Sequence, residues 1–398
     1  MGRPIPRTIE RPGWFERAGC ADLIHFTEDA HDPEPLEVDS SARRGARRRR
    51  SGDRGRATRV GSGCTSDWPH RRDTVHAASL EGNRYGDSPN REVLVYLPPS
   101  YESAVSRRYP VIYLLHGFGA SDRSWEGGYK GFRIGAAMDS LVAAGAVREM
   151  IVVMPSARTR LGGSFYTNSE AAGDWEDFIS KELVAYVDGR YRTLARPESR
   201  GLAGHSMGGY GTLAVGMRHA GDEYGALYAM SACCTRFSRQ PSPDEAAAWE
   251  TLSRVGSLGD VQSLSFYPQV FLALSAAFSP NVNRPPLYVD FPFELKAGRW
   301  QPMPAVQAEW TEHAPYDMLP RYAGRLKQLR GFAFDVGTRD QLVPPSQIAA
   351  IDSALVRAGV PHVYETYDGD HTSAIGLRMT TRVLPFFSRT LDFTDTRR

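Results

Sequence analysis

The stretch GLAGHSMGGYGTLAV, residues 201–215, places Ser206 between two glycines in the pattern Gly-x-Ser-x-Gly. The apolar run before the serine predicts a short strand, and the small residues after it predict a helix. A serine at such a sharp turn has strained backbone and an exposed hydroxyl, and its neighbours must be small. The helix N-terminus also directs partial positive charge at this turn. The stretch therefore predicts a nucleophile, provided that the rest of the chain supplies a matching fold and a base.

The segments around this stretch alternate between strand and helix patterns. Apolar or alternating runs predict further strands at residues 91–98, 109–117, 149–155, 225–232, 331–337 and 362–367. Amphipathic or small-residue patterns predict helices at residues 174–191, 207–220, 345–360 and 377–391. This alternation predicts an α/β fold with a mostly parallel central sheet and helices on both faces. In such sheets, functional residues gather at the carboxyl ends of the strands.

Residues 236–330 interrupt the alternation with prolines, aromatic residues and charges. This segment is too long for a plain connection, so we expect a lid-like insertion on the substrate side of the sheet. Its aromatic content favours aryl or hydrophobic acyl groups.

A serine hydroxyl is a weak nucleophile without a base, and in this type of fold an acid and then a histidine follow the serine along the chain. His371 is the candidate base, because it lies in the polar loop DGDHTSA between the last strand and the last helix. The segment DVGTRDQL supplies Asp335 and Asp340 as candidate acids. We favour Asp340, which lies beyond the Gly-Thr turn, because the acid must reach the loop that carries His371.

The segment HGFGAS, residues 116–121, follows an earlier strand, where an oxyanion hole needs a backbone donor. The expected donors are the N–H groups of Phe118 and Met207. Trp125, Phe165 and His205 are the candidates for substrate contact. Packing or hydrogen bonding beneath the loops is the alternative for each of these three residues.

The composition is that of a globular protein with a sizeable core, since 41% of the 398 residues are hydrophobic and 24% are charged. No run reaches the roughly 18 apolar residues of a membrane span. Residues 42–72 hold 11 Arg against 2 Asp. Such a cluster can bind phosphates, but without interleaved aromatic residues we interpret residues 1–72 as a disordered segment or a wrongly assigned start. The catalytic domain is then expected at residues 73–398.

The first residues lack the apolar stretch of a signal peptide, which predicts a cytoplasmic protein if the sequence is taken literally. A wrongly assigned start would instead allow a secreted or periplasmic protein. The four cysteines show no metal-ligand spacing, and the adjacent Cys233 and Cys234 are interpreted as buried free thiols. We therefore expect neither a metal nor a cofactor.

Several motifs occur in an order that resembles one known family. They are SLEGNRYGDSPNREVLVYLPPSY, RYPVIYLLHGFGASDRSW, GDWEDFISKELVAYVDGRYRT, GHSMGGYGTL, DVGTRDQL and DGDHTSAI. Over about residues 75–392 the chain resembles the esterase D-like family of α/β-hydrolases. That family includes feruloyl and acetyl xylan esterases, S-formylglutathione hydrolases, enterochelin-type esterases and mycolyltransferases. The resemblance implies that the nucleophile, acid and base are Ser206, Asp340 and His371, and that Phe118 and Met207 are the oxyanion donors.

These features predict a serine hydrolase of carboxylic esters that forms an acyl-enzyme and needs no cofactor. The expected substrate is a small-molecule or polysaccharide-linked ester, and no nucleic-acid partner is expected. A thioesterase of the S-formylglutathione hydrolase type and an acyltransferase are the alternatives within the fold. A binding protein that keeps the hydrolase fold and makes its contact through the Arg-rich segment is the alternative outside enzymes.

Overall fold

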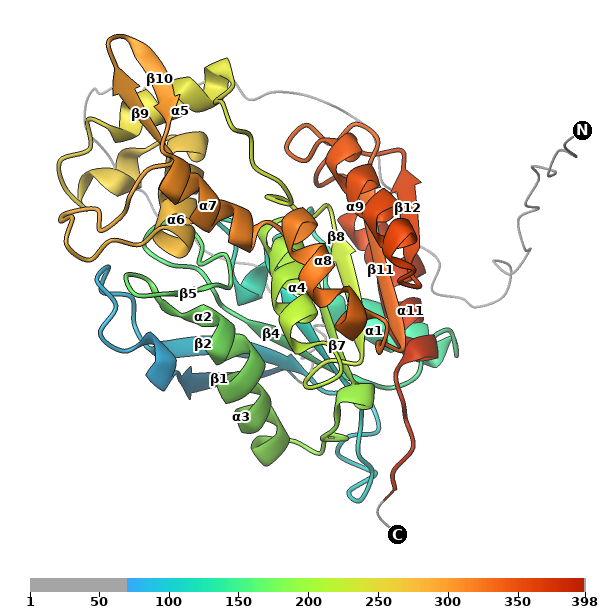
Figure 1. Ribbon diagram of the computed structural model, residues 1–398. Helices are drawn as coiled ribbons and strands as arrows, with labels where there is room; N and C mark the ends of the chain where they lie inside the picture. Colours follow the sequence, from blue (N-terminus) through green and yellow to red (C-terminus); the bar gives the residue numbers. More distant parts are fainter. Residues whose placement is uncertain (1–69, 397–398) are drawn as a thin grey trace, which may run out of the picture. The chain divides into compact units, whose positions relative to one another are not determined.

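The computed structural model describes residues 70–396, and its centre is an eight-stranded sheet (Figure 1). The strand order is β1-β2-β4-β3-β7-β8-β11-β12. β2 pairs antiparallel with β1 and β4. The remaining neighbours in this order, from β4 through β3, β7, β8 and β11 to β12, pair in parallel. The bounds are β1 (His70–His76), β2 (Asn90–Tyr96), β3 (Val111–Leu115), β4 (Ile151–Pro155), β7 (Arg200–His205), β8 (Ala226–Met230), β11 (Gly331–Gly337) and β12 (Val363–Tyr367). The prediction of an α/β fold with a mostly parallel sheet is confirmed.

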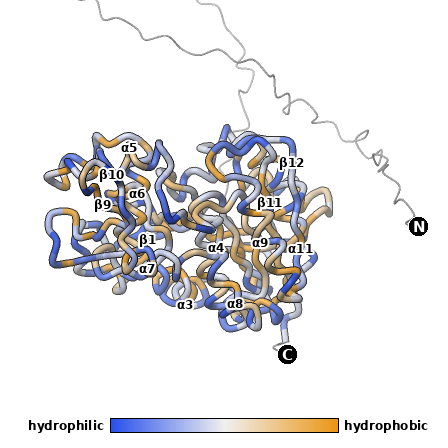
Figure 2. The backbone as a smooth tube through the Cα atoms, turned by 45° about the horizontal axis from the view of Figure 1, so that its top comes forward, coloured by the Kyte–Doolittle hydropathy of each residue, from blue (hydrophilic) through white to orange (hydrophobic). Residues whose placement is uncertain are grey.

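Helices cover both faces of this sheet, which explains why its central strands are apolar on both sides. On one face lie α1 (Ile134–Ala143) and the continuous run of α10 (Ile375–Arg378), a π-helical turn and α11 (Leu384–Thr390). On the other lie α3 (Leu183–Arg190), α4 (Met207–His219) and α9 (Pro345–Ala358). Along β3, side chains alternate between the two cores (Tyr113 in one, Leu114 in the other). In Figure 2 the apolar stretches of the tube run through the region of α4, α9 and α11.

Small residues let α4 lie deep in the fold. A Cβ atom added to Gly211 would lie 2.5 Å from the Tyr166 ring, and one added to Gly216 would lie 2.7 Å from the Leu227 side chain. Contacts this short are not tolerated in close-packed interiors. The glycine-rich sequence after Ser206 therefore serves helix packing as well as the turn.

The predicted insertion at residues 236–330 forms a helical cap at the carboxyl-end side of the sheet (Figure 1). The elements of the cap are α5 (Pro243–Leu252), α6 (Phe266–Phe278), the hairpin β9 (Phe293–Lys296) and β10 (Arg299–Pro302), and α7 (Pro304–His313). The last helix of the segment, α8 (Pro315–Leu326), packs on α4 and α9 on the face of the sheet. A hydrogen bond of 2.7 Å from the Tyr85 hydroxyl to the Leu287 carbonyl ties the cap to the segment before β2.

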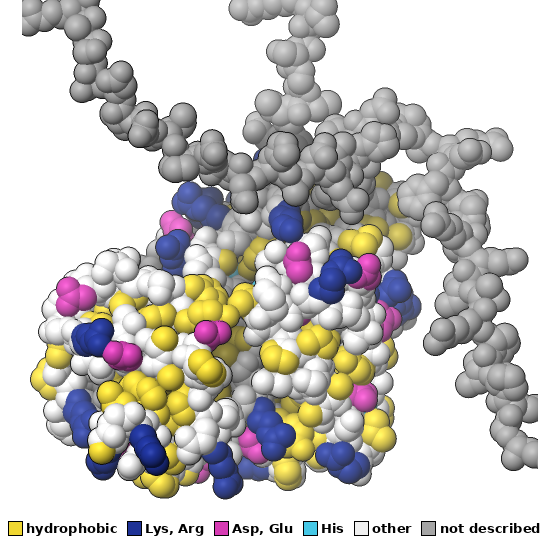
Figure 3. Space-filling model, turned by 90° about the horizontal axis from the view of Figure 1, so that it is seen from above, with side chains coloured by type: hydrophobic (Ala, Val, Ile, Leu, Met, Phe, Trp, Pro, Cys, Tyr) yellow, Lys and Arg dark blue, Asp and Glu magenta, His cyan; other side chains and the backbone are white. Residues whose placement is uncertain are grey.

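Most aromatic side chains of this cap pack against one another. Trp249, Phe278 and Trp310 are each at most 3% exposed, and their ring centroids lie 5.7–6.0 Å apart in contacting pairs. They form the interior of the cap, so they are not free to contact a substrate. The exposed apolar side chains of the cap include Phe266, Tyr267 and Leu295, and hydrophobic side chains gather on this lobe when the molecule is seen from above (Figure 3).

The bounds of the predicted strands and helices agree with the structure to within a few residues, but neither β1 nor α1 is predicted from the sequence. β1 begins at His70, so the sheet includes residues that the sequence analysis assigned to the N-terminal segment 1–72. The rest of that segment lies outside the described residues. Among the helices of residues 70–396, none has the length and apolar character needed to cross a membrane.

Candidate active site

Ser206 lies at the turn between β7 and α4 with φ 58° and ψ −115°, a left-handed backbone that a non-glycine residue rarely adopts. Its N–H donates to the Met230 carbonyl at 3.0 Å, and its side chain is half-buried. A Cβ atom on Gly204 would lie 2.3 Å from the Gly208 carbonyl oxygen, and one on Gly208 would lie 2.3 Å from the Leu115 oxygen. The two glycines of the motif are thus required for the close approach of β7, α4 and β3 that forms this turn.

His371 and Asp340 form a buried hydrogen-bonded pair on neighbouring loops at the carboxyl ends of β12 and β11. His371 Nδ1 lies 2.8 Å from Asp340 Oδ2 and 3.0 Å from Oδ1, and the two residues are 4% and 6% exposed. Asp340 Oδ1 also accepts the backbone N–H groups of Leu342 and Val343. Burial alone would raise the pKa of Asp340, but the hydrogen bond and charge of His371 and the two N–H groups outweigh it and hold this pKa below its usual range. The carboxylate therefore favours the tautomer in which the proton of His371 is on Nδ1 and Nε2 carries the lone pair.

Asp335, the other candidate acid, is engaged elsewhere. Its Oδ2 accepts hydrogen bonds from Arg378 Nε at 2.8 Å and from the Tyr228 hydroxyl at 2.9 Å. Burial raises the pKa of Asp335 to about 6, against the opposing effect of Arg378. Of the two candidates, the structure brings Asp340 to His371 and pairs Asp335 with Arg378.

His205 connects the turn of Ser206 to the loop of His371. Its Nε2–H donates to the His371 carbonyl at 2.7 Å, and the two imidazole rings lie 4.7 Å apart. Burial lowers the pKa of His205 to about 3, so this ring is neutral near pH 7. No hydrogen bond joins the Ser206 hydroxyl to the His371 ring among residues 70–396. Such contacts are often long in unliganded hydrolases and tighten when substrate binds.

The loop after β3 presents the first expected oxyanion donor. The backbone N–H groups of Phe118 and Met207 donate to no backbone acceptor in the described part of the chain, so both are available to a ligand. Their side chains pack together over residues 162–163: a Cβ atom on Gly163 would lie 2.4 Å from Met207 Sδ and 2.8 Å from Phe118 Cδ2. The small residues of the loop after β4 thus let the two donor segments approach each other.

Hydrogen bonds fix the backbone just before Phe118. The Gly117 N–H donates to the Tyr129 hydroxyl at 2.9 Å, and the Gly117 carbonyl accepts from His116 Nδ1 at 2.8 Å. His116 Nε2 accepts the Ala157 N–H at 2.8 Å, which places the ring proton on Nδ1. Burial lowers the pKa of His116 to about 4, so the ring is neutral. The donor and the acceptor of Gly117 are both occupied by the protein, and the next N–H, that of Phe118, remains free.

The sequence singles out the HGFG segment that His116 begins, but it does not predict the role of Tyr129 in holding this loop. Tyr129 lies 12 residues from Gly117 along the chain, and only the path of the loop between them brings its hydroxyl to that N–H.

The three predicted substrate-contact residues lie beneath the surface. Trp125, Phe165 and His205 are 0%, 1% and 2% exposed. Packing beneath the loops, the alternative that the sequence left open, describes their positions. A different aromatic pair reaches the surface: the ring of Phe118, half-buried, lies 5.9 Å from that of Phe266, which is 47% exposed.

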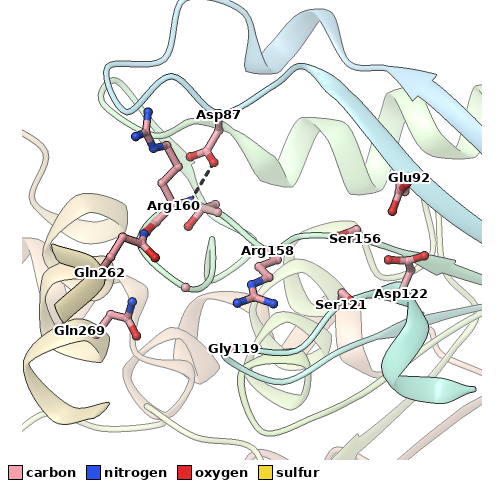
Figure 4. A pocket seen from close by; sticks show the side chains of 12 residues that line it. Asp87, Glu92, Gly119, Ser121, Asp122, Ser156, Arg158, Arg160, Gln262 and Gln269 are labelled. Atoms are coloured by element: carbon pink, nitrogen blue, oxygen red, sulfur yellow. Dashed lines mark hydrogen bonds between the residues drawn. The ribbon is translucent and has the colours of Figure 1, made fainter. Parts of the chain in front are cut away.

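A polar pocket of about 450 Å³ adjoins the loop after β3, because Gly119 of this loop and Gly162 both line it and are joined by a backbone hydrogen bond of 3.0 Å (Figure 4). Asp122 in this lining is 1% exposed, and its Oδ2 has no hydrogen-bond partner. Burial raises the pKa of Asp122. The other lining residues are Asp87, Glu92, Ser121, Ser156, Arg158, Thr159, Arg160, Gln262 and Gln269, of which the two glutamines come from the cap.

The fold and the arrangement of this turn and its loops define an α/β-hydrolase. Residues 88–375 match the model of the family described as "Putative esterase", and the chain belongs to this family of carboxylic ester hydrolases. The resemblance and the fold class that the sequence analysis gave are thereby confirmed.

Individual relatives agree with this assignment. The chain is 31% identical over 156 residues to an endo-1,4-beta-xylanase/feruloyl esterase of Xylanibacter ruminicola, covering 38% of this chain and 21% of the relative. It is 33% identical over 138 residues to an esterase of Mycobacterium tuberculosis, covering 33% of this chain and 27% of the relative. The chain thus spans about a quarter or less of the length of these curated relatives.

Solved structures share the fold. A ferulic acid esterase superposes with a TM-score of 0.56 at 23% identity, covering 81% of this chain and 98% of that one. An S-formylglutathione hydrolase of Staphylococcus aureus superposes with a TM-score of 0.50 at 17% identity, covering 82% and 100%.

Proposed function

We propose that the protein hydrolyses carboxylic esters through a covalent acyl-enzyme on Ser206. The observation that carries this proposal is the buried His371–Asp340 pair, which orients an imidazole on a loop tied by His205 to the serine turn. A strained serine, a fixed imidazole and two free backbone donors are the groups that acyl transfer needs.

The proposed reaction has two stages. His371 Nε2 accepts the proton of the Ser206 hydroxyl as its oxygen attacks the ester carbonyl, and the N–H groups of Phe118 and Met207 bind the resulting oxyanion. His371 then gives the proton to the departing alcohol. In the second stage His371 takes a proton from water, the hydroxide attacks the acyl-enzyme, and Ser206 recovers its proton as the acid leaves. Asp340 holds the imidazole in one tautomer and stabilises its charged form throughout.

The surroundings of the turn suggest where the two halves of an ester would bind. Phe118 and Phe266 offer an apolar, partly exposed surface above the oxyanion donors, which suits an aryl or other hydrophobic acyl group. The names of two relatives, a xylanase/feruloyl esterase and a ferulic acid esterase, support an aryl acyl group of this kind.

We assign the alcohol half to the polar pocket next to Gly119. The ionised carboxylates of this pocket can only accept hydrogen bonds, and its guanidinium groups can only donate them. A ligand that binds both kinds of group must therefore donate hydrogen bonds to the carboxylates and accept them from the guanidinium groups. Hydroxyl groups meet this demand. The three carboxylates and two arginines nearly balance in charge, which favours a neutral alcohol rather than a strongly charged one.

The experiment compares hydrolysis of p-nitrophenyl acetate and of a methyl hydroxycinnamate by the wild type and by Ser206→Ala and His371→Asn. Ser353→Ala is the matched control, because that serine is exposed on α9 and its hydroxyl bonds only its own helix. We expect both site variants to lose at least three orders of magnitude in kcat. A thioester or an added alcohol as acyl acceptor, assayed in parallel, separates the thioesterase and acyltransferase alternatives.

A further inference from the structure

The loop after β8, residues 231–235, shares backbone hydrogen bonds with the nucleophile turn. Cys233 N–H donates to the Ser206 carbonyl at 3.3 Å, and Ser206 N–H donates to the last residue of β8. The loop also packs tightly on the first turn of α4, since a Cβ atom on Gly209 would lie 2.9 Å from Ala232 Cα. A change in the backbone of this loop must therefore alter the position of the Ser206 backbone.

Two adjacent thiols meet in this loop. The Cys234 thiol donates to the Cys233 sulfur across 3.1 Å, and both residues are half-buried. Consecutive side chains of an extended strand point to opposite faces, so such contact needs a bent backbone. Cys234 supplies the bend with φ 57°, and Ser231 at the start of the loop has φ 41°. Left-handed backbone at a non-glycine residue is uncommon and concentrates at functional sites.

The environment of the pair suits oxidation by a small molecule. The hydrogen bond to Cys233 and then burial raise the pKa of the Cys234 thiol, which therefore remains protonated and directs its S–H at the neighbouring sulfur. The Cys233 sulfur therefore lies directly beside a second thiol that can close a disulfide once Cys233 has been oxidised.

We propose that Cys233 and Cys234 are a modification site, at which hydrogen peroxide converts the adjacent thiols into a disulfide and thereby lowers activity at Ser206. The Cys233 thiolate attacks one peroxide oxygen, the O–O bond breaks, and the released hydroxide takes a proton to become water. The Cys234 sulfur then attacks the sulfenic acid, loses its proton and expels a second water. Two thiols are oxidised and one peroxide is reduced to two waters, so the step balances.

A disulfide between adjacent cysteines closes a small ring, and the size of this ring explains why its formation would disturb Ser206. Adjacent Cα atoms are only about 3.8 Å apart across a trans peptide, whereas disulfides usually span about 4.4–6.8 Å. Closing the bond must turn the peptide between the two cysteines, next to the Cys233 N–H that holds the Ser206 carbonyl. Strained disulfides are also readily reduced, so the modification should be reversible by a thiol.

The test treats the full-length protein with hydrogen peroxide, alkylates free thiols with iodoacetamide, and maps the peptide that contains both cysteines. We expect this peptide to lose two hydrogens and escape alkylation after peroxide, and to be alkylated twice after dithiothreitol. Ester turnover should fall at least fivefold in the oxidised protein and return after reduction, whereas Cys234→Ser should lose less than twofold under the same treatment.

Two results would overturn the inference: alkylation of both cysteines after peroxide, or a mapped disulfide that leaves turnover unchanged. The activity arm rests on the proposed esterase function, but the peptide map does not. A reduced protein without ester turnover would therefore count against the proposed function, while the map would still decide whether the disulfide forms.

Discussion

The structure predicts that the substitution Asp340→Asn changes the tautomer of the His371 imidazole. Asparagine has the shape of aspartate, but one of its oxygens is replaced by an NH₂ donor. Oδ1 of Asp340 accepts the N–H groups of Leu342 and Val343 at 3.0 and 2.8 Å, so the amide oxygen must take that position. The NH₂ group is then forced to the position of Oδ2, 2.8 Å from His371 Nδ1.

A donor at that position requires Nδ1 of His371 to accept, which moves the ring proton to Nε2. His371 in this tautomer cannot take the proton of Ser206. The same fault in a Ser-His-Asp triad lowers kcat by about 10⁴-fold, or roughly 5.5 kcal/mol in activation free energy. Because the two backbone hydrogen bonds are kept, we expect KM to stay within a few-fold of wild type and the melting temperature to change by only a few degrees.

The assay is steady-state hydrolysis of p-nitrophenyl acetate together with thermal melting. Asp368→Asn is the matched control, since Asp368 lies on the loop of His371 but is exposed and bonds only Arg339. This control should keep wild-type kcat. A kcat for Asp340→Asn within tenfold of wild type, in a protein with an unchanged melting temperature, would refute the tautomer argument.

Three further predictions concern the loops that carry Phe118 and Gly163 and the buried imidazole of His116. Tyr129→Phe leaves the Gly117 N–H without its acceptor, a loss of about 1–3 kcal/mol, so kcat should fall about tenfold or more with little change in KM; unchanged kinetics would contradict this role. His116 is neutral in the fold to about pH 4, whereas the unfolded chain gains this proton near pH 6.5, so the unfolded state binds more protons between these values. Its contribution to the free energy of unfolding should fall by about 1.4 kcal/mol per unit as pH drops through that window, and urea titrations at pH 7 and 5 should give a smaller difference for His116→Asn than for wild type. Gly163→Ala should lower kcat and melting temperature by pushing apart the two donor segments, whereas Gly324→Ala, which meets no atom within 4 Å, should change neither much; equal effects of the two would contradict the packing argument.

The sheet was predictable because most of its strands are buried on both faces and are therefore continuous apolar runs. β1 was missed because its sequence, HRRDTVH, is polar and carries charged side chains at the sheet edge, where Arg71 pairs with Glu102. Such a strand is stabilised by its backbone partner β2, and a pattern of hydrophobic residues cannot reveal that pairing.

The Ser206 turn and the candidate pair His371–Asp340 are predicted from local signals, since each candidate lies in a turn or loop directly after a predicted strand. The groups that hold them depend on contacts between distant segments. The Tyr129 hydroxyl meets Gly117, and His205 meets the carbonyl of His371, only after the loops have folded. The aromatic residues of the cap show the opposite case: their abundance suggested a substrate surface, whereas Trp249 and Trp310 are used as packing.

The most direct test of the central claim is to identify the residue that carries the acyl group. The protein is mixed with p-nitrophenyl acetate, quenched in acid within the first turnovers, digested and mapped by mass spectrometry. The account predicts an acetyl group on Ser206 in the wild type. His371→Asn is supplied with a more reactive ester, which can acylate Ser206 slowly without the base, and in this variant the acyl group should accumulate on Ser206. Full turnover without any acyl group on Ser206, or with the group on another residue, would contradict it.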